Sequence, residues 1–384
     1  MPAKNRFRHQ TYSNSPPGGR YKVLTPGELV DLDSPAYHAE LNEARNRLVA
    51  ADVQAIYLLH GTFAGDDLLG LLGEWERYSP TRAKRWRGGV KRIVDSISGE
   101  LGNYTAAFAN RLAADRQPPA DPQIPVRMFS WSGENQHFAR VDAAVRLLDE
   151  LFSREFVTGR ILLWGHSHGG NVLALLTNLL AADGETFQRF LGATGYSEEG
   201  RNRGQWDRPV WKRVLDKLDE GRRRLSDVKL DIVTFGAPIR YGWDSGGYAT
   251  LTHFVNHRPS EGIAEYLSSR PNSLEDLRSS SLGDMMQQLG IAGSDFLPSL
   301  FAWSNWTTER RLRKFLQLGC RRRDYWKHLS LGMRVPADGF TWLVDYSNCD
   351  ANRAGQQFGH SVYTDSRWLP FHAKQIAGRI DNSP

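Results

Sequence analysis

Short apolar runs alternate with helical patterns along most of the chain, and this alternation constrains the fold more than any other feature of the sequence. Nearly uninterrupted apolar runs of this length are typical of strands buried on both faces of a sheet. Between two of them, ARVDAAVRLLDELF (139–152) places its apolar residues on one helical face. The alternation predicts an α/β fold, with a mostly parallel sheet, helices on both faces and right-handed crossovers. The runs are VQAIYLL (53–59), VRMFSW (126–131), RILLWG (160–165) and VKLDIVTF (228–235), with LTHFVNH (251–257) and FTWLVDY (340–346) as further candidates.

The same rhythm, in a chain of 384 residues, predicts a single domain with additions. Residues 1–34 contain NSPPGG and TPGE and are expected to form a loose N-terminal arm. The core is expected over 35–259, with a polar, charged insertion at 184–227. A mostly helical pattern predicts a second insertion at 260–338, and 339–384 return to the core. Both insertions are expected at one end of the sheet, as a cap.

Composition narrows the class of protein. The net charge is +6, but Lys and Arg are spread among acidic residues, so nucleic acid is not an expected partner. The two cysteines, Cys320 and Cys349, are too few for a disulfide framework, and MPAKNRFRHQ lacks the apolar region of a signal peptide. The longest apolar stretch, 161–182, is interrupted by GHSHGGN and suits a core better than a bilayer. A cytoplasmic protein is expected, with export that needs no cleavable signal left open.

The motif GHSHGG lies between an apolar run and a helical pattern. In that setting G-x-S-x-G is a nucleophile elbow, in which Gly165 and Gly169 let the backbone pass closely and Ser167 takes a strained conformation. Two other interpretations exist. The segment is a glycine-rich turn without chemistry, or His166 and His168 are metal ligands. A metal site needs a third ligand at a suitable spacing, which the sequence does not offer, so no metal is expected.

A serine at its ordinary pKa is a poor nucleophile, so an elbow requires a base, an acid and an oxyanion hole. The triad residues are expected in the order Ser, Asp or Glu, His along the chain. The oxyanion hole is expected from the backbone N–H of His168 and one from the loop HGTFAGDD (60–67). Thr62 is the first choice in that loop and Phe63 the alternative, unless His60-Gly61 is an ordinary turn. The sequence has no phosphate-binding glycine loop, and no cofactor is expected.

The segments LLHGTF, FSWSGEN, LWGHSHGG and VTFGAPIRYGW, in this order, resemble the α/β-hydrolase superfamily and in particular its lipase-like esterases. The resemblance covers roughly residues 50–260 and 338–375. It implies the α/β-hydrolase fold, with the helical insertions forming a cap, and a serine hydrolase activity.

The resemblance implies that the base lies in the loop after the last strand, where SNCDANRAGQQFGHSVYT carries His360. The alternative is that this histidine has a surface or packing role. Among the other histidines after the motif, His372 lies in an apolar helical start and is expected in the core, whereas His253 alternates with apolar residues on a strand. His257 is a minor candidate, and His328 falls in the second insertion.

The acid is harder to place. In the lipases it commonly follows the strand after T-F-G-x-P, but here that strand runs into NHRP (256–259), without an Asp. Asp244, which follows the preceding strand in IRYGWD, is the first choice. The alternative acids are Glu261 and Asp345, and the alternative role for Asp244 is that of a charged surface turn.

The second insertion contains a basic, aromatic cluster formed by FAWSNW (301–306), ERRLRKF (309–315) and RRRDYWKH (321–328). A cap helix with inward aromatics and solvated arginines is favoured. The alternative is a helix that rests on anionic lipid, which makes peripheral membrane contact a candidate interaction. Trp131 lines either the same pocket or the core.

The expected activity is hydrolysis of carboxylic esters through an acyl-enzyme by Ser167, His360 and Asp244. Lipid or phospholipid acyl esters are candidate substrates, alongside small-molecule esters. One alternative is an amidase or thioesterase with the same triad, and another is a non-catalytic interaction protein that keeps the fold. The sequence leaves the oligomeric state open.

Overall fold

The structure is a computed structural model of the whole chain. It describes residues 6–10, 16–61, 103–113, 123–154, 156, 158–196, 208–238, 240–268, 283–292, 306–316, 333–346 and 359–381.

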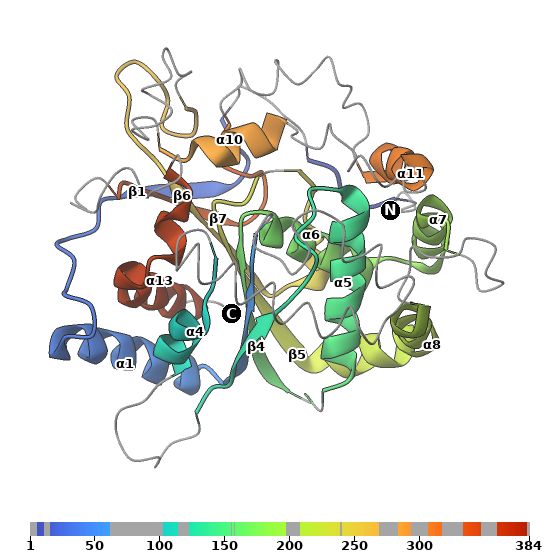
Figure 1. Cartoon of the computed structure of the whole chain (residues 1–384), viewed down its shortest axis with the longest axis horizontal. Helices are drawn as coiled ribbons and strands as arrows, with labels where there is room; N and C mark the ends of the chain where they lie inside the picture. The colour runs from blue at the N-terminus through green and yellow to red at the C-terminus, as the bar shows by residue number, and fades with distance from the viewer. Residues whose placement is uncertain are drawn as a thin grey trace.

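A seven-stranded sheet, parallel throughout, forms the centre of the molecule (Figure 1). Each apolar run that the sequence analysis selected is a strand, so the predicted α/β class with a parallel sheet is confirmed. The order across the sheet is β1-β7-β6-β5-β4-β2-β3. The strands are β1 (Arg20–Leu24), β2 (Val53–Leu59), β3 (Val126–Phe129), β4 (Gly159–His166), β5 (Val228–Phe235), β6 (Thr250–Asn256) and β7 (Phe340–Val344).

The strand order is not the usual order of the α/β-hydrolase fold, so that finer expectation is not met in full. One strand, β1, comes from the N-terminal arm and pairs with β7 at one edge, from Arg20 opposite Phe340 to Leu24 opposite Val344. The sequence analysis did not predict it, because RYKVL is short and two of its five residues are charged, so only its distant partner makes it a strand. The arm is further fixed by Phe7, which stacks on Phe190 at 5.2 Å between ring centroids.

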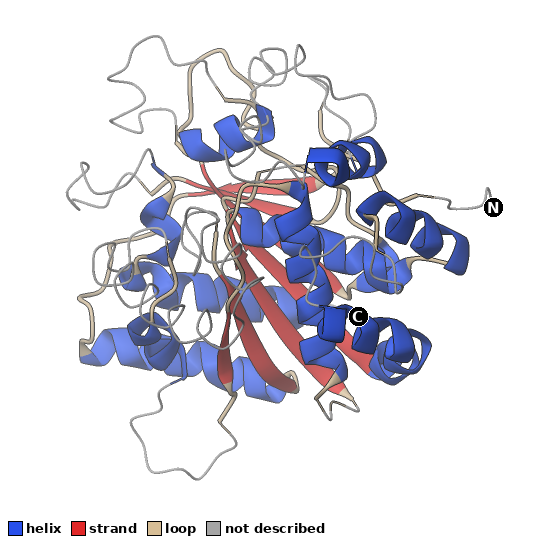
Figure 2. Cartoon of the chain, turned by 45° about the vertical axis from the view of Figure 1, so that its right-hand side comes forward, coloured by secondary structure: helices blue, strands red, loops and turns tan. Residues whose placement is uncertain are grey.

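Helices cover both faces of the sheet (Figure 2). Side chains alternate along β4, so Ile161 and Leu163 join the core on one face, whereas Leu162 and Trp164 join the core on the other. The helices α5 (His137–Phe152) and α6 (His168–Ala181) pack on the first face. The second face is covered by α1 (Pro35–Ala50), α4 (Ala106–Ala113) and α13 (Leu369–Asp381).

An ion pair fixes the register of the central strands near their amino ends. Arg160 of β4 binds both carboxylate oxygens of Asp231 of β5, at 3.0 and 3.1 Å, and Thr250 at the start of β6 donates to the same carboxylate at 2.7 Å. A buried carboxylate with three hydrogen bonds tolerates no register shift, because any slip would leave the charge unpaired. The opposite, carboxyl ends of the strands are thereby held level with one another.

The insertion at 184–227 forms two helices, α7 (Gly184–Thr194) and α8 (Arg208–Arg224), and the short 3-10 turn η1 (Leu225–Asp227). The expectation that it caps one end of the sheet is wrong for α8, which packs along α5 (Figure 1). Trp211 donates to Asp142 at 2.7 Å, and Arg213 pairs with Asp149 at 2.6 Å. The insertion thus adds an outer layer beside α5, and its Trp211, Val214 and Leu218 join the same core cluster as the apolar residues of α5.

The second insertion contributes α10 (Met285–Ala292) and α11 (Trp306–Leu316). In Figure 1, α10 lies above the carboxyl ends of the strands. Helix α11 docks on α5 through Glu309, which accepts hydrogen bonds from the backbone N–H groups of His137 and Phe138 at 3.1 and 2.6 Å. Trp306 is 60% exposed, so the expected inward orientation of the aromatics fails there, although it holds for the partly buried Phe315. The basic run 321–328 lies outside the described residues.

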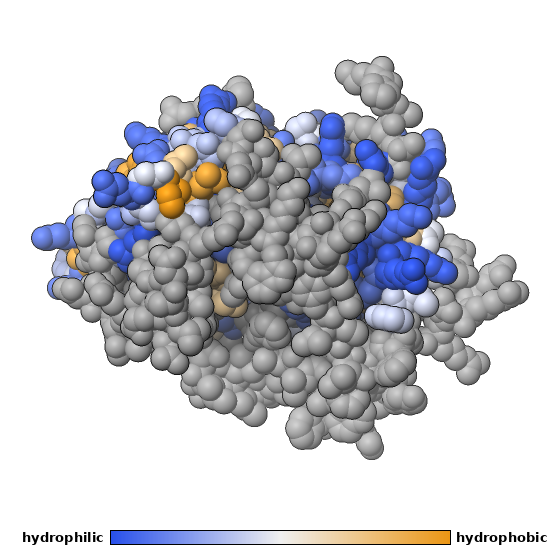
Figure 3. Space-filling view, turned by 90° about the horizontal axis from the view of Figure 1, so that it is seen from above, coloured by the Kyte–Doolittle hydropathy of each residue, from blue (hydrophilic) through white to orange (hydrophobic). Residues whose placement is uncertain are grey.

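Figure 3 views the molecule from above, with hydrophobic residues gathered mainly in one small area of the described surface. The large apolar side chains that are exposed within the described ranges are Leu32, Ile263, Met286 and Trp306. Among the described helices, none combines the length and apolarity needed to cross a bilayer.

Candidate active site

Ser167 lies between β4 and α6 with φ 52° and ψ −128°, a backbone conformation that residues other than glycine rarely adopt. The turn is held by hydrogen bonds from Ser167 N to the Phe235 carbonyl at 2.8 Å and from Gly170 N to the Ser167 carbonyl at 3.0 Å. The flanking glycines allow this path, since a Cβ on Gly165 would approach Gly170 N to 2.9 Å and one on Gly169 the His60 carbonyl to 2.8 Å. This is the geometry expected of a nucleophile elbow.

The loop after β2 reaches the same serine. A Cβ on Gly61 would lie 3.3 Å from Ser167 Oγ, so the His60-Gly61 backbone passes beside the hydroxyl. Trp131 holds His60 in three ways. It stacks on the ring at 5.5 Å, donates its backbone N–H to His60 Nε2 at 3.3 Å, and donates its indole N–H to the His60 carbonyl at 3.0 Å. Trp131 therefore supports this loop from the core. Thr62 and Phe63, the expected second oxyanion donors, lie outside the described residues.

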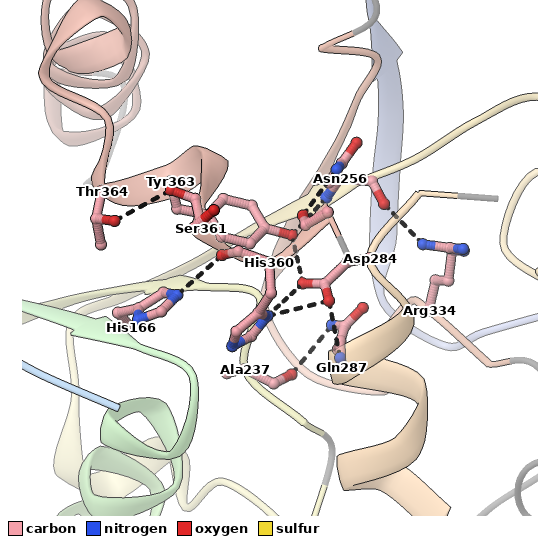
Figure 4. A network of polar contacts seen from close by, with 11 residues as sticks. His166, Ala237, Asn256, Asp284, Gln287, Arg334, His360, Ser361, Tyr363 and Thr364 are labelled. Carbon is pink, nitrogen blue, oxygen red and sulfur yellow. Dashed lines mark hydrogen bonds and ion pairs between the residues drawn. The ribbon is translucent and has the colours of Figure 1, made fainter. Parts of the chain in front are cut away.

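His360, the expected base, is paired with an acid that the sequence analysis did not choose. Its ring Nδ1 lies 2.8 Å from Oδ2 and 3.0 Å from Oδ1 of Asp284 (Figure 4). A carboxylate accepts, so Nδ1 carries the proton and the neutral ring presents Nε2 as its basic nitrogen. The Asp284 side chain is fully buried, whereas that of His360 is 13% exposed. A buried carboxylate and a partly accessible imidazole are thus joined as in a triad.

Asp284 is the N-cap of α10, because its Oδ1 accepts from the backbone N–H of Gln287 at 2.8 Å. Its own N–H donates to the carbonyl of Asn256, the last residue of β6, at 3.1 Å, and the preceding Gly283 forms a backbone bridge with His257. The chain therefore leaves the end of β6 and returns to it before the acid. Asp284 therefore lies next to the end of β6 in space, although it comes 28 residues after that end in the sequence.

Two further side chains interact with the Asp284 carboxylate, one through a hydrogen bond and one through its positive charge. Tyr363 donates its hydroxyl to Oδ2 at 2.8 Å, and burial raises the pKa of Tyr363 well above its usual value, which keeps it a donor. Arg334 is fully buried and donates to the Asn256 carbonyl at 2.7 Å. Burial lowers the pKa of Arg334 to about 10, and attraction by Asp284 opposes that shift, so the guanidinium stays charged at neutral pH. No sequence pattern predicted this buried cation.

The three carboxylates proposed from sequence lie elsewhere, and this corrects the expected acid. Asp244 accepts from Gly246 N at 3.1 Å as the cap of a short 3-10 turn, η2 (Ser245–Gly247), and lies 3.4 Å from Arg8. Asp345 pairs with Arg258 at 3.4 Å, and Glu261 is an exposed turn residue. A local signal for Asp284 does exist, because D-M-M-Q has an acceptor and a Gln at the spacing of a helix N-terminus.

Three other histidines that follow Ser167 in the chain, His253, His257 and His372, are buried. His372 is buried and hydrogen-bonded to the Tyr346 hydroxyl at 2.8 Å, as its apolar context predicted, and burial lowers its pKa to about 3. His253 lies 2.7 Å from the Thr234 hydroxyl, and burial lowers its pKa to about 4. Burial, the largest cause, also lowers the pKa of His257 to about 4. His328 lies outside the described residues.

On the other side of the serine, His168 joins a buried polar network. Its Nδ1 accepts from Arg140 and from Asn171, each at 3.1 Å. Arg140 has no acceptor atom, so Nδ1 is unprotonated and the neutral ring carries its proton on Nε2. Arg140 also donates to the Tyr241 hydroxyl at 2.9 Å. Sequence reasoning missed Arg140, because an arginine on an amphipathic helix usually reads as solvated.

His166 and His168 therefore have different partners. His166 Nε2 lies 3.2 Å from the His360 carbonyl, on the side opposite the Arg140 network. Within the ranges that the structure describes, no group of three or more His, Cys, Asp or Glu side chains is arranged to hold a metal ion. The two histidines thus have protein partners that account for their orientation.

The site brings together Ser167, Gly61, His166, His360 and Asp284 at the carboxyl ends of β2, β4 and β6. The described contacts of the His360 ring are with Asp284, His166 and Tyr363, and none of them is a hydrogen bond to Ser167. Searches against protein-family models, curated proteins and solved structures find no match to this chain. The structure itself establishes an α/β protein whose described residues form a seven-stranded parallel sheet.

Proposed function

We propose that the protein is a serine hydrolase that cleaves carboxylic esters through an acyl-enzyme, with Ser167 as nucleophile, His360 as base and Asp284 as acid. The observation that carries the proposal is the Asp284–His360 pair. The His360 ring packs on the ring of His166, with centroids 4.7 Å apart, and His166 immediately precedes the strained Ser167. Residues from β4, the second insertion and the C-terminal segment converge there. Structural ion pairs do not need a strained serine beside them.

The chemistry follows from the ring geometry. His360 Nε2 takes the proton of Ser167 Oγ as that oxygen bonds to the acyl carbon, and the carbonyl oxygen becomes an oxyanion. Collapse of the intermediate breaks the bond to the alcohol oxygen, which leaves with the proton from the imidazolium. Water then attacks the acyl-serine with His360 again as base. This step releases the carboxylic acid product and regenerates the free Ser167 hydroxyl. Hydrogen bonds of this kind often reach catalytic length only when substrate is bound.

Charge is stabilised at two places in this scheme. Asp284 holds Nδ1–H and faces the imidazolium that forms in each half-reaction. The oxyanion would be held by the N–H of His168, which lies in the first turn of α6, because the first N–H groups of a helix have no acceptor within it. The N–H of Thr62 is the second donor that the sequence predicts. The position of Gly61 beside Ser167 Oγ supports a contribution from that loop.

The sequence resemblance to lipase-like α/β-hydrolases supports the same assignment. The elbow follows β4, and the acid and the base follow β6 and β7, which is the chain order of nucleophile and base that the resemblance implies. The acid differs in being separated from its strand by residues 257–283. We therefore assign the site to the α/β-hydrolase type, with an added edge strand at β1 and an insertion before the acid.

Acyl esters of lipids or phospholipids are the substrate class we favour among esters. Helix α11 exposes Trp306 together with Arg310, Arg311 and Lys314, a combination suited to an anionic lipid surface. Cosedimentation with vesicles that contain anionic lipid tests this contact, with zwitterionic vesicles as the control. Equal recovery with both vesicle types, or a Trp306→Ala, Arg310→Ala variant that binds as well as wild type, would contradict it.

The proposed activity is tested first by covalent labelling with a fluorophosphonate, which reacts with an activated serine. We expect labelling of the wild-type chain at Ser167, none in Ser167→Ala, and very little in His360→Ala. A panel of p-nitrophenyl esters of increasing acyl length, with matched p-nitroanilides and thioesters, then separates the ester hydrolase from an amidase or thioesterase. A folded wild-type chain that neither labels nor hydrolyses any of them would favour the non-catalytic alternative.

A further inference from the structure

His166, the residue before the nucleophile, contacts the residue proposed as base. It is the last residue of β4, it is 1% exposed, and its Nε2 lies 3.2 Å from the backbone carbonyl of His360 (Figure 4). The two imidazole rings also pack against each other, with centroids 4.7 Å apart and planes 38° apart. Neither the sequence motif nor the proposed reaction gives His166 a role.

The direction of the hydrogen bond follows from its acceptor. A carbonyl oxygen only accepts, so His166 Nε2 carries a proton and donates it. His360 is therefore held at two points. Asp284 holds its ring through Nδ1, and His166 holds its main chain through the carbonyl. These two contacts come from opposite sides, one from the acid on α10 and one from the strand that ends in the serine.

The rest of the segment is fixed from the side of the acid. Asn256 Nδ2 donates to the Gly359 carbonyl at 2.8 Å, and the Asn256 backbone N–H donates to the Tyr363 hydroxyl at 2.7 Å. Those bonds set where residues 359–363 stand relative to β6, but not how far they stand from Ser167. The bond from His166 does set that distance, because His166 and Ser167 are consecutive residues.

We propose that His166 is a positioning residue that sets the distance and angle between the His360 imidazole and Ser167 Oγ. The proposal rests on the serine hydrolase function proposed above. A donor next to the nucleophile makes the separation of the two reacting groups independent of small shifts of the C-terminal segment. Proton transfer depends steeply on this geometry, and a misplacement of about 1 Å can lower a rate by about 10².

Three variants test the role. His166→Gln keeps a side-chain N–H that reaches about as far as Nε2, whereas His166→Phe keeps the ring contact and loses the donor. His372→Gln is the matched control, since His372 is also buried and bonded through Nε2 but packs in the core away from the serine. For each variant we would measure kcat and KM on a p-nitrophenyl ester, the second-order rate of fluorophosphonate labelling, and the midpoint of thermal unfolding.

We expect His166→Phe to lower kcat and the labelling rate by about 10- to 100-fold with little change in KM, because positioning acts on the chemical step. His166→Gln should recover most of that loss, and His372→Gln should keep wild-type rates. A folded His166→Phe variant with wild-type kcat would overturn the proposal. So would a His166→Gln variant as slow as His166→Phe, which would indicate a structural role.

A measurement without turnover separates this inference from the proposed function. Nitrogen NMR of a histidine-labelled chain reports the tautomer of His166, and a proton on Nε2 is expected. A proton on Nδ1 alone would overturn the inference even in an active enzyme. A wild-type chain with the expected tautomer but no labelling at Ser167 would overturn the proposed function and, with it, the positioning role.

Discussion

The two histidines on either side of Ser167 are held by different parts of the chain. His166 reaches forward to the carbonyl of His360, in a segment far along the sequence. His168 turns back to Arg140 and Asn171, which lie on the two helices that pack on one face of the sheet. In both cases a neutral ring with a proton on Nε2 explains the contacts.

One side of Ser167 is therefore held by segments far along the chain, and the other side by the helices packed on one face of the sheet. The His166 side depends on contacts from β6, α10 and the C-terminal segment, so its geometry requires several distant segments to dock correctly. The His168 side is built within the core from α5, α6 and Tyr241, which follows β5. We therefore expect damage on the first side to affect the chemical step, and damage on the second side to affect stability and oxyanion binding together.

The largest effect is expected at the acid. Asp284→Asn should lower kcat by about 10³- to 10⁴-fold, because an amide does not fix the reactive tautomer of His360 or stabilise the imidazolium. Asp244→Asn, the acid first chosen from sequence, is the matched control and should retain activity within a few-fold. The measurement is steady-state hydrolysis of a p-nitrophenyl ester by chains with equal circular dichroism. Equal losses in the two variants would remove Asp284 from the triad.

A smaller effect is expected at Arg140, on the other side of the serine. Arg140→Met leaves His168 Nδ1 and the Tyr241 hydroxyl without the guanidinium donor, which should cost about 1 to 3 kcal/mol of unfolding free energy. The proton on His168 should then redistribute between its two nitrogens, whereas the tautomer of His166 should not change. Urea denaturation and histidine NMR report the two effects. A shift at His166 of the same size would mean that the two sides are not independent.

Trp131 tests the loop that faces the serine from β2. Trp131→Phe keeps the stack on His60 but removes the indole N–H bond to its carbonyl, a loss of about 0.5 to 1.5 kcal/mol. We expect kcat to fall a few-fold, since the Gly61 backbone is held less firmly beside Ser167. Trp342→Phe, at a strand position that does not touch His60, is a suitable control. Unchanged kinetics in Trp131→Phe would show that the stack alone holds the loop.

The smallest effect at neutral pH is expected from the core histidines, which separate acid unfolding from acid inactivation. Burial lowers the pKa of His253 to about 4 and that of His372 to about 3, from 6.5. Between these values the unfolded chain binds more protons than the folded chain, so stability is full above pH 6.5 and falls as the pH is lowered toward 4. The thermal midpoint followed from pH 7 to pH 4.5 should therefore decrease, and His372→Gln should make that decrease shallower. An identical slope in the variant would contradict this account.

Local patterns predicted the strands and the serine, but not the acid. Continuous apolar runs and the G-x-S-x-G turn are decided by neighbouring residues, so β2, β4 and β5 and the elbow could be read directly from the sequence. His360 could be placed only through the resemblance to a family. Asp284 was not predicted as the acid because the chain leaves the end of β6 at His257 and returns to it only at Gly283. The closeness of Asp284 to β6 therefore does not show in its distance along the sequence. The edge strand β1 and the buried cations Arg140 and Arg334 escaped for the same reason, since each depends on partners far along the chain.

The backbone bridge between His257 and Gly283 closes a loop at its base. The Asp284 carboxylate is thereby anchored at the end of β6. The start of the loop is held a second time, because Ser268 accepts from the buried Arg334 at 2.6 Å and Leu267 forms a backbone bridge with Met333. A segment from another protein can therefore replace part of this loop only if it keeps these contacts with Arg334 and Met333.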